Sequence, residues 1–360
     1  PQKANPLESV LAYKEMGWPN DTYVDGKNIT QWEGYIRDYQ SNPGKYPNGY
    51  IFDENGNLFL MKERNMFDDM TDNFGFMQNH SMSVSGGREK TVYRIGVGYT
   101  GEDGILITDK DSYDRLNLST FMGVDVNSWL TTQLDLKYGN SKQKKVEAGG
   151  RNTVWVAAMN LPSYQNNEDY EENGTVYPAE SPATYIRYGD PRRIKRNDLR
   201  ALGRIILSPL KGLKITGEYT YNRTTEQNKF YKNKYQYIGM NFTGVLNSTE
   251  NSSYAVTSKY TDYNAVNLFA NYDMTFGKHD ISVMGGYNQE SSHTESQYSY
   301  RTDVVVGSLP SLSLSTGTPI TNDAFEEFAI RGLFYRVNYS YAGKYLLEAN
   351  GRYDGTSRFP

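Results

Sequence analysis

Cysteine is absent from this chain of 360 residues, which excludes a disulfide framework and a thiolate metal site. Long apolar runs are also missing: none approaches the ~18 residues of a transmembrane helix, and the mean hydropathy is -0.72. The net charge of -4 is small for this length and argues against a dedicated nucleic-acid binder, which usually carries a basic face. We therefore expect no nucleic-acid partner.

Alternation of apolar and polar residues is the main pattern that is present, in a chain that also contains 32 tyrosines. For example, Leu134 and Leu136 alternate with Gln133 and Asp135, as in a strand with one apolar and one polar face. Similar alternation occurs at 213–222, 266–274, 333–341 and 345–354. The pattern predicts strands and leaves two classes open, a soluble sandwich with one wet face per sheet or a barrel whose apolar face meets lipid.

The lengths of the expected connections favour the barrel. Tight reversals are predicted at 86–90, 126–129, 209–212, 276–279 and 342–344, and long polar loops rich in aromatic residues at 102–112, 142–197, 226–261 and 294–326. Short turns therefore fall on one edge of the sheet and long loops on the other, as in barrels with periplasmic turns and extracellular loops. The predicted fold class is all-β, a transmembrane antiparallel β-barrel in the bacterial outer membrane.

Ten strands are expected, and they divide the chain into two parts. They lie at about 78–86, 91–101, 113–124, 129–140, 198–208, 213–224, 262–275, 279–292, 327–341 and 344–356. If the first short turn is periplasmic, residues 1–76 form an extracellular loop region and residues 77–360 form barrel strands with their turns and loops. The chain starts at Pro1 without a signal segment and its last residues still have a strand pattern, so we expect an internal segment of a longer protein.

Local signals are also present in the first part. Short helices are predicted at 6–16 and 30–40, with Asn5 and Thr30 as plausible caps. A small hairpin is predicted at 52–58, where Asn55-Gly56 suits a type I′ turn.

Three stretches resemble one family in register. His80 to Gly104 has the sequence HSMSVSGGREKTVYRIGVGYTGEDG, and Arg331 to Phe359 has the sequence RGLFYRVNYSYAGKYLLEANGRYDGTSRF, with Thr356 where Ser is common. A weaker match begins at Gly277 with GKHD. Together they resemble the SusC/RagA-like TonB-dependent transporters of Bacteroidetes outer membranes.

The resemblance implies a fold and a set of partners. It implies a barrel of about 22 strands, within the size range of outer-membrane barrels, occluded by an N-terminal plug and energised by TonB, ExbB and ExbD through a TonB box. It also implies a SusD-like lipoprotein over the extracellular loops and import of oligosaccharides or peptides. The plug, the TonB box and a signal peptide are not found in this segment, so these partners would act through other parts of the protein.

Catalytic motifs are missing from the sequence. It contains three histidines but no Gly-x-Ser-x-Gly elbow, no HExxH helix and no phosphate-binding glycine loop. Carboxylates adjacent in sequence, such as Asp68 and Asp69, do not provide the separation that a glycosidase needs across its cleft. Asp53 to Asn57 lacks the glycine and glutamate of an EF-hand loop and is expected to be a turn. We expect no enzyme, metal site or cofactor.

The candidate ligand site is the aromatic, amide-rich loop at 142–197. Sugars stack on aromatic rings and need amides or carboxylates for their hydroxyl groups, although the same rings could instead pack the loop or the lipoprotein. The candidate substrate-binding residues are Trp155, Tyr164, Asn166, Tyr170, Tyr177 and Tyr185.

A basic cluster ends the same loop. It consists of Arg187, Arg192, Arg193, Lys195 and Arg196, which either meet lipopolysaccharide phosphates or an acidic partner, or form a solvated charge run.

Three hypotheses for function are considered. The leading hypothesis is TonB-dependent import of a glycan or peptide together with a SusD-like lipoprotein. The alternative is a surface binding or adhesion protein anchored by a barrel without transport. A barrel enzyme would need a nucleophile beside a base, and the sequence offers no candidate.

Overall fold

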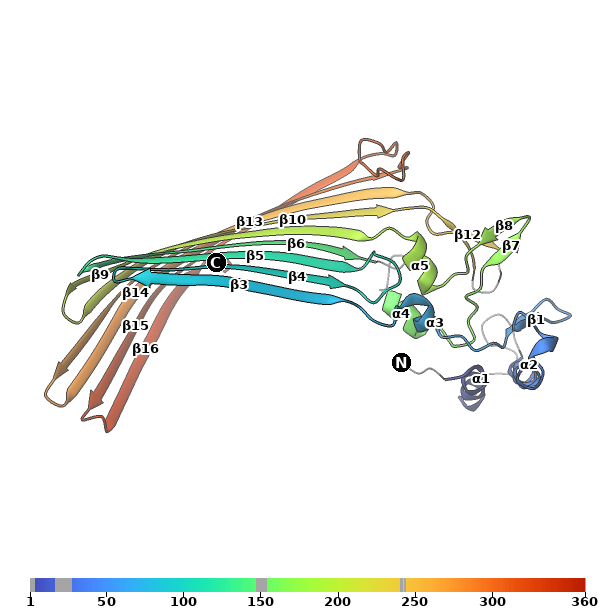
Figure 1. The fold of residues 1–360 in the computed structure, drawn as a ribbon, viewed down its shortest axis with the longest axis horizontal. Coiled ribbons are helices and arrows are strands. Elements are labelled where there is room, and N and C mark those ends of the chain that lie inside the picture. Colours follow the sequence, from blue (N-terminus) through green and yellow to red (C-terminus); the bar gives the residue numbers. More distant parts are fainter. Residues whose placement is uncertain (1–3, 17–27, 147–153, 240–241, 243, 360) are drawn as a thin grey trace.

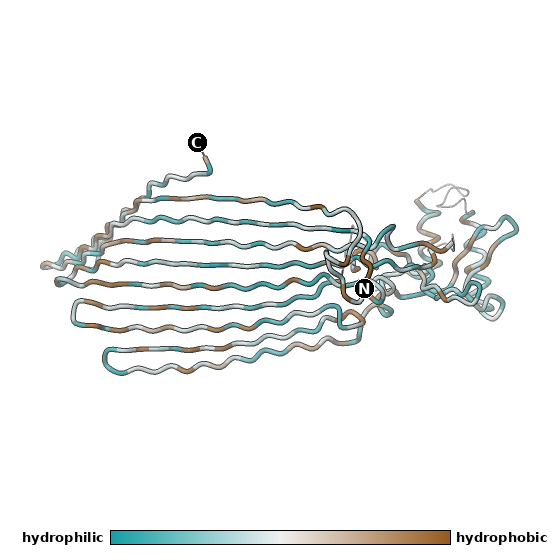
Figure 2. The backbone as a smooth tube through the Cα atoms, turned by 90° about the horizontal axis from the view of Figure 1, so that it is seen from above, coloured by the Kyte–Doolittle hydropathy of each residue, from teal (hydrophilic) through white to brown (hydrophobic). Residues whose placement is uncertain are grey.

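The computed structural model describes residues 4–16, 28–146, 154–239, 242 and 244–359. Its main element is one antiparallel sheet with the strand order β16-β15-β14-β13-β10-β9-β6-β5-β4-β3. The long strands lie side by side in an arch that does not close, so that β3 and β16 are its edges (Figures 1 and 2). Within the described ranges, no helix is both long and apolar enough to cross a membrane.

Each of the predicted strands is present in this sheet. The strands are β3 (Met77–Arg88), β4 (Thr91–Asp103), β5 (Ser112–Asn127), β6 (Leu130–Lys145), β9 (Arg192–Leu210), β10 (Leu213–Lys232), β13 (Ser253–Phe276), β14 (His279–Thr302), β15 (Ile320–Tyr341) and β16 (Tyr345–Thr356). The tight turns between them match the prediction, and Gly212, Gly277 and Gly343 adopt positive φ there. The predicted all-β class with an antiparallel sheet is therefore confirmed, and the sheet is an open segment.

The predicted loops at 142–197, 226–261 and 294–326 are too long. The strands continue into all three, because β6 ends at Lys145, β9 begins at Arg192, β10 ends at Lys232, β13 begins at Ser253, β14 ends at Thr302 and β15 begins at Ile320. Most of the basic cluster predicted to end the first of these loops therefore lies in β9. In these extensions the backbone ladder is unbroken, but apolar residues fall on both faces, such as Phe230 on the concave face and Val256 on the convex face, with polar residues around them. Alternation fades where neither face meets an apolar medium, so the sequence pattern loses the strand before the hydrogen bonds end.

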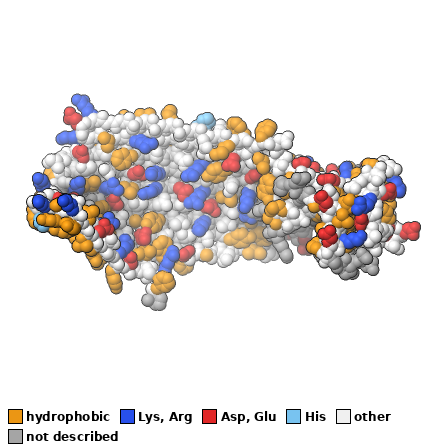
Figure 3. All heavy atoms as spheres, turned by 90° about the horizontal axis from the view of Figure 1, so that it is seen from below, with side chains coloured by type: hydrophobic (Ala, Val, Ile, Leu, Met, Phe, Trp, Pro, Cys, Tyr) orange, Lys and Arg blue, Asp and Glu red, His pale blue; other side chains and the backbone are white. Residues whose placement is uncertain are grey.

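The two faces of the sheet differ in polarity, as predicted. On the convex face of β13, Val266, Leu268, Tyr272 and Met274 are all exposed. A rise of ~3.3 Å per residue and a tilt of ~40° make such a row of apolar residues ~20 Å tall, close to the ~25 Å height of the lipid-facing band of outer-membrane barrels. Figure 3 looks onto the concave face, where charged side chains of both signs lie among uncharged polar ones.

Shorter elements gather at the end of the sheet opposite the tight turns (Figure 1). They are α1 (Pro6–Glu15), α2 (Ile29–Ser41), η1 (Pro43–Lys45), β1 (Tyr50–Phe52), β2 (Leu58–Leu60), α3 (Met66–Met70), α4 (Val154–Asn160), β7 (Tyr170–Glu172), β8 (Thr175–Tyr177), α5 (Pro182–Tyr188), β11 (Gln236–Ile238) and β12 (Val245–Asn247). We call this group the loop assembly. Both helices predicted near the N-terminus are among its members.

Two local predictions in the loop assembly need correction. Asn28, not Thr30, caps α2, because its Oδ1 accepts a hydrogen bond from the Gln31 amide at 2.9 Å and it precedes the first turn. The hairpin β1–β2 forms, but Gly56 has positive φ and Asn55 does not, so the turn is not type I′. The Asp53 carboxylate instead accepts hydrogen bonds from the backbone amides of Asn55 and Asn57.

Candidate functional site

A continuous polar belt crosses the concave face of the sheet. Arg204 of β9 donates to Glu218 of β10 at 2.5 Å and to Gln133 of β6 at 3.0 Å. The other carboxylate oxygen of Glu218 accepts from Asn267 of β13 at 3.3 Å, and the Asn267 carbonyl oxygen accepts from Asn288 of β14 at 2.8 Å. These bonds link neighbouring strands through side chains, as expected for a wet interior rather than an apolar core.

A glycine lets the polar belt reach the last strand. Arg352 of β16 donates to Asn288 of β14 at 2.9 Å and to Asp354 at 2.6 Å, and so passes over β15. Gly332 of β15 lies between them, opposite both Asn288 and Asp354. A Cβ atom at Gly332 would lie 2.6 Å from Arg352 Nη2, so any larger residue would displace this arginine.

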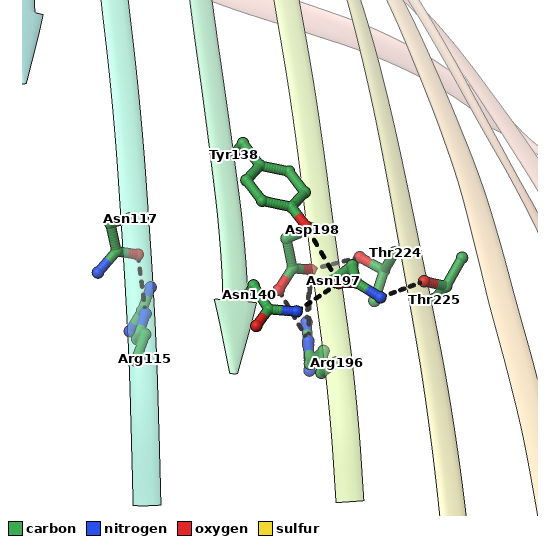
Figure 4. Close-up of polar contacts among 9 residues, drawn as sticks. All are labelled: Arg115, Asn117, Tyr138, Asn140, Arg196, Asn197, Asp198, Thr224 and Thr225. Carbon is green, nitrogen blue, oxygen red and sulfur yellow. Dashed lines mark hydrogen bonds and ion pairs between the residues drawn. The ribbon is translucent and has the colours of Figure 1, made fainter. Parts of the chain in front are cut away.

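Above the apolar band both faces of the sheet carry polar contacts (Figure 4). On the convex face, Asn197 Oδ1 accepts from the Tyr138 hydroxyl at 3.2 Å and from Asn140 Nδ2 at 2.6 Å. On the concave face, the neighbouring residue Asp198 accepts from Arg196 Nε at 3.0 Å and from the Thr224 hydroxyl at 2.6 Å. Tyr138 thus marks the level at which the convex surface changes from apolar to polar.

The first apolar cluster of the loop assembly joins the segment before β3 to the 142–197 loop. Trp32 of α2 is 1% exposed, and its indole nitrogen donates to the Leu60 carbonyl oxygen at 2.7 Å. The ring of Tyr164 lies edge-on against Trp32, with ring centroids 4.8 Å apart. Tyr164 is 3% exposed, so its ring is a packing element in this conformation.

A second apolar cluster holds α3, α4 and α5 together. It contains Met66, Met70, Leu106, Val154 and Ile186, all buried. Trp155 lies at its edge, half-buried, and stacks on Phe67 with ring centroids 6.4 Å apart.

A lysine from the β4–β5 loop caps α5. Lys110 Nζ donates to the carbonyl oxygens of Ile186, Arg187 and Gly189 at 3.0, 2.5 and 2.9 Å. A cation at a helix C-terminus satisfies carbonyl groups that have no partner within the helix. Burial lowers the pKa of Lys110, as expected for an ammonium group removed from water.

The remaining predicted residues lie at three places in the loop assembly. Asn166 is buried, and its side-chain amide donates to the Glu168 carbonyl oxygen at 3.2 Å. Tyr170 and Tyr177 lie opposite each other in the β7–β8 hairpin, both half-buried. The Tyr170 ring meets Phe242 edge-on at 5.6 Å.

Tyr185 belongs to a group of rings that we call the tyrosine cluster, formed by Tyr185, Tyr188, Tyr235 and Tyr237. The Tyr185 hydroxyl donates to Glu180 at 3.0 Å, and Tyr188 stacks on Tyr235 with centroids 5.7 Å apart. Burial raises the pKa of Tyr185 and of Tyr235, and the Glu180 carboxylate adds to both shifts. The cluster combines aromatic surface with a carboxylate, which is the chemistry that a sugar or a peptide requires.

Sequence reasoning missed Tyr235 and Tyr237 as partners of Tyr185. They come from the connection between β10 and β13, and their only local signal is the Tyr-x-Tyr spacing. The structure thus brings one predicted residue together with two others and leaves Tyr164 and Trp155 elsewhere. Whether any of these side chains contacts a ligand stays a prediction.

Metal binding has no evident location in the part of the chain that the structure describes. No group of three or more His, Cys, Asp or Glu side chains there is arranged to hold an ion.

Comparison with known proteins finds sequence relatives that are TonB-dependent receptors. No protein-family model matches the chain. TonB-dependent receptor P3 of Formosa agariphila is 23% identical over 298 residues, covering 79% of this chain and 29% of the relative. TonB-dependent receptor SusC of Bacteroides thetaiotaomicron is 22% identical over 305 residues, covering 78% of this chain and 29% of the relative. The chain thus spans less than a third of the length of these relatives.

Among solved structures, the RagAB peptide transporter matches with a TM-score of 0.72 at 17% identity, covering 99% of this chain and 40% of that chain. The same TM-score of 0.72 is found for the RagAB peptide importer in its 'open-open' state, at 16% identity. The chain is a SusC/RagA-like barrel segment. This SusC/RagA-like segment belongs in an outer membrane. The alternating strands and the long loops on one edge of the sheet led to the same prediction from the sequence.

Proposed function

We propose that the protein containing this SusC/RagA-like segment imports an oligosaccharide or a peptide across the outer membrane by a TonB-dependent mechanism. The observation that carries the proposal is the combination of a polar concave face with a loop assembly at one end of the sheet. Such a wall can line a passage for a hydrophilic solute. The relatives named as TonB-dependent receptors support energy coupling, which would act through parts beyond this segment.

The loop assembly is our candidate for part of the ligand-facing surface. Tyr170, Tyr177 and Tyr185 are partly exposed and are proposed to contact the ligand, whereas the buried Tyr164 and Asn166 and the packed Trp155 would hold the loop in shape. Rings beside the Glu180 carboxylate favour an oligosaccharide. A peptide is the second substrate class, because the RagAB complex of similar fold is a peptide transporter.

The proposed partners follow from the same arrangement. Residues 1–76 are proposed to lie outside the cell with the other loops, where a SusD-like lipoprotein would cover them. TonB, ExbB and ExbD would act from the periplasmic side.

Uptake in the native host tests the proposal. The gene is deleted and restored, and accumulation of labelled oligosaccharide and peptide pools is measured with and without a protonophore. Import predicts accumulation that needs both the gene and the proton gradient. A surface adhesion protein, the alternative, would give binding that needs the gene but does not change when the gradient is removed.

A matched pair of variants then tests the ligand surface. Tyr188→Ala with Tyr237→Ala removes two rings of the tyrosine cluster, and Tyr13→Ala with Tyr39→Ala removes two rings beside the first apolar cluster. We expect only the first pair to reduce uptake at limiting substrate while the amount of heat-modifiable barrel stays level. Equal uptake by both would remove the tyrosine cluster from the ligand surface and leave transport itself unaffected.

A further inference from the structure

Five basic side chains lie together on the convex face of β6, β9 and β10. Lys142 of β6 lies directly opposite Lys195 of β9, and Lys144 lies opposite Arg193. Arg193 in turn lies opposite Lys229 of β10. We call these residues the basic outer patch.

The height of these five side chains relative to the apolar band follows from the alternation of residues along the strands. Tyr138 and Leu199 are the last large apolar residues on the convex face of β6 and β9, and both are exposed. The next rung is Asn140 with Asn197, and the rung after it is Lys142 with Lys195. Four residues at ~3.3 Å each place the first lysines ~13 Å along the strand from Tyr138. The basic outer patch therefore begins just above the apolar band, on the side away from the lumen.

Charge within the patch is only partly neutralised. Asp109 pairs with Lys144 at 3.3 Å, and Asp190 pairs with Arg193 at 2.8 Å. Among the described residues no ion pair is found for Lys142, Lys195 or Lys229. Like charges directly opposite each other destabilise a sheet, so an anion that binds between them would relieve the repulsion.

A third acidic residue lies close to the patch. Asp114 is opposite Lys142 on β5, and its carboxylate accepts a hydrogen bond from the Tyr99 hydroxyl at 2.8 Å. Three carboxylates against five basic side chains still leave an excess of positive charge.

The rest of the convex rim carries charge of both signs. On β13, β14 and β15 the convex positions above the apolar band include the acidic residues Asp262, Glu295 and Glu327 as well as Arg301 and Arg331. Basic residues on adjacent strands directly opposite one another are therefore a feature of the sector formed by β6, β9 and β10. A shallow depression of about 350 Å³ borders this sector and is lined by Lys195, Arg223 and Asn197 among others.

We propose that the basic outer patch binds the phosphate groups of phosphorylated lipids in the outer leaflet. Phosphorylated headgroups are the anions next to a convex surface directly above the hydrocarbon core, whereas a solute in the lumen is on the other side of the wall. Lysine and arginine form charge-assisted hydrogen bonds with phosphate oxygens. The inference does not depend on which solute the barrel transports.

Lipid binding to the intact purified transporter tests this assignment. The probes are bisphosphorylated lipid A and the same lipid after enzymatic dephosphorylation, titrated in one detergent at two ionic strengths. The test variant is Lys142→Gln/Lys195→Gln/Lys229→Gln. Its control is Lys137→Gln/Arg200→Gln, because these two residues lie opposite each other on the concave face of the same strands. Inorganic phosphate serves as a competitor.

We expect the phosphorylated lipid to bind more tightly than the dephosphorylated one, and the triple variant to lose about tenfold or more in affinity, as the loss of three charged partners implies. The control should stay within about twofold, and millimolar phosphate should not displace the lipid. If the triple variant fails to give a heat-modifiable barrel, Lys195→Gln alone should lose affinity and a part of the salt dependence.

Other outcomes overturn the proposal. Equal affinity for the two lipids, or unchanged affinity of the triple variant, would leave the patch as a solvated charge run. Full displacement by inorganic phosphate would assign it to free anions. Unchanged lipid binding with loss of an acidic surface lipoprotein from the purified complex would assign it to a protein partner.

Discussion

The ring of Tyr164 meets Trp32 edge-on, with ring centroids 4.8 Å apart, although the two residues are far apart in the sequence. Ser163, the neighbour of Tyr164, donates to the Ala4 carbonyl oxygen at 2.5 Å and accepts from the Arg64 amide through its own carbonyl oxygen at 2.7 Å. The segment before β3 and the longest loop therefore share one apolar core. This core gives the loop assembly a fixed shape above the sheet.

Removing either ring should loosen the loop assembly without affecting the sheet. Trp32→Ala or Tyr164→Ala deletes a buried aromatic side chain, which costs ~3–5 kcal/mol in a packed core. We expect faster cleavage of the loops by an added protease on intact cells, with a normal amount of heat-modifiable barrel. Tyr177→Ala, at a half-buried hairpin position, is the control. Equal cleavage rates for the three variants and the parent would contradict a shared core.

Lys110→Met should release the C-terminal end of α5. The ammonium group donates to three carbonyl oxygens there, and hydrogen bonds to charged groups are worth ~1.5–3 kcal/mol. Hydrogen exchange in residues 185–190 should become faster, while exchange in β4 and β5 should not change. Lys211→Met, in a tight turn at the other end of the sheet, is the control, and equal effects of the two substitutions would refute the cap.

Acid should weaken the contact between the 142–197 loop and the segment before β3. Glu168 pairs with Lys62 at 2.5 Å and with Arg64 at 2.9 Å. Burial of Glu168 raises its pKa, but hydrogen bonds and charge interactions with these two cations outweigh the burial, so the pKa lies below the usual 4.5. A depressed folded-state pKa means that the stabilisation is complete above pH 4.5 and is lost as the pH falls through the folded value.

The measurement is proteolysis of the loop assembly on intact cells between pH 6 and the acid limit of the barrel. The parent should become more sensitive below about pH 4.5, and Glu168→Gln should be sensitive already at neutral pH with a smaller change on acidification. The same acid transition in parent and variant would show that Glu168 is not responsible.

Neighbouring residues on β15 test the two faces of the sheet. Val337 lies on the convex face opposite Val283 and Ala349, and Asn338 lies on the concave face opposite Glu348. Val337→Arg should cost ~2–4 kcal/mol if it lies near the bilayer midplane and should reduce the heat-modifiable barrel, whereas Asn338→Arg should fold normally beside a carboxylate. Equal losses would mean that the faces are assigned wrongly.

The sequence predicted the strands correctly where they cross the membrane and ended them too early beyond it. Between Val266 and Met274 alternation marks β13 because one face meets lipid and the other water, yet the extension from Ser253 to Thr261 has no such contrast and is predicted as loop. In the loop assembly, Tyr164 and Tyr185 looked equivalent in the sequence. Tyr164 is buried against Trp32, whereas Tyr185 lies near Tyr235 and stays partly exposed. Both neighbours are distant in the sequence, so only the tertiary fold distinguishes the two tyrosines.

The position of the loops outside the cell is measured most directly by labelling single-cysteine variants with a membrane-impermeant maleimide. The chain has no cysteine of its own, so each label reports one site. Val176 in the β7–β8 hairpin is 60% exposed, and Lys344 lies in the tight turn between β15 and β16. Val176→Cys should label in intact cells, and Lys344→Cys only after the outer membrane is permeabilised. Labelling of Lys344→Cys but not of Val176→Cys in intact cells would contradict the proposed orientation of the barrel and, with it, the import function.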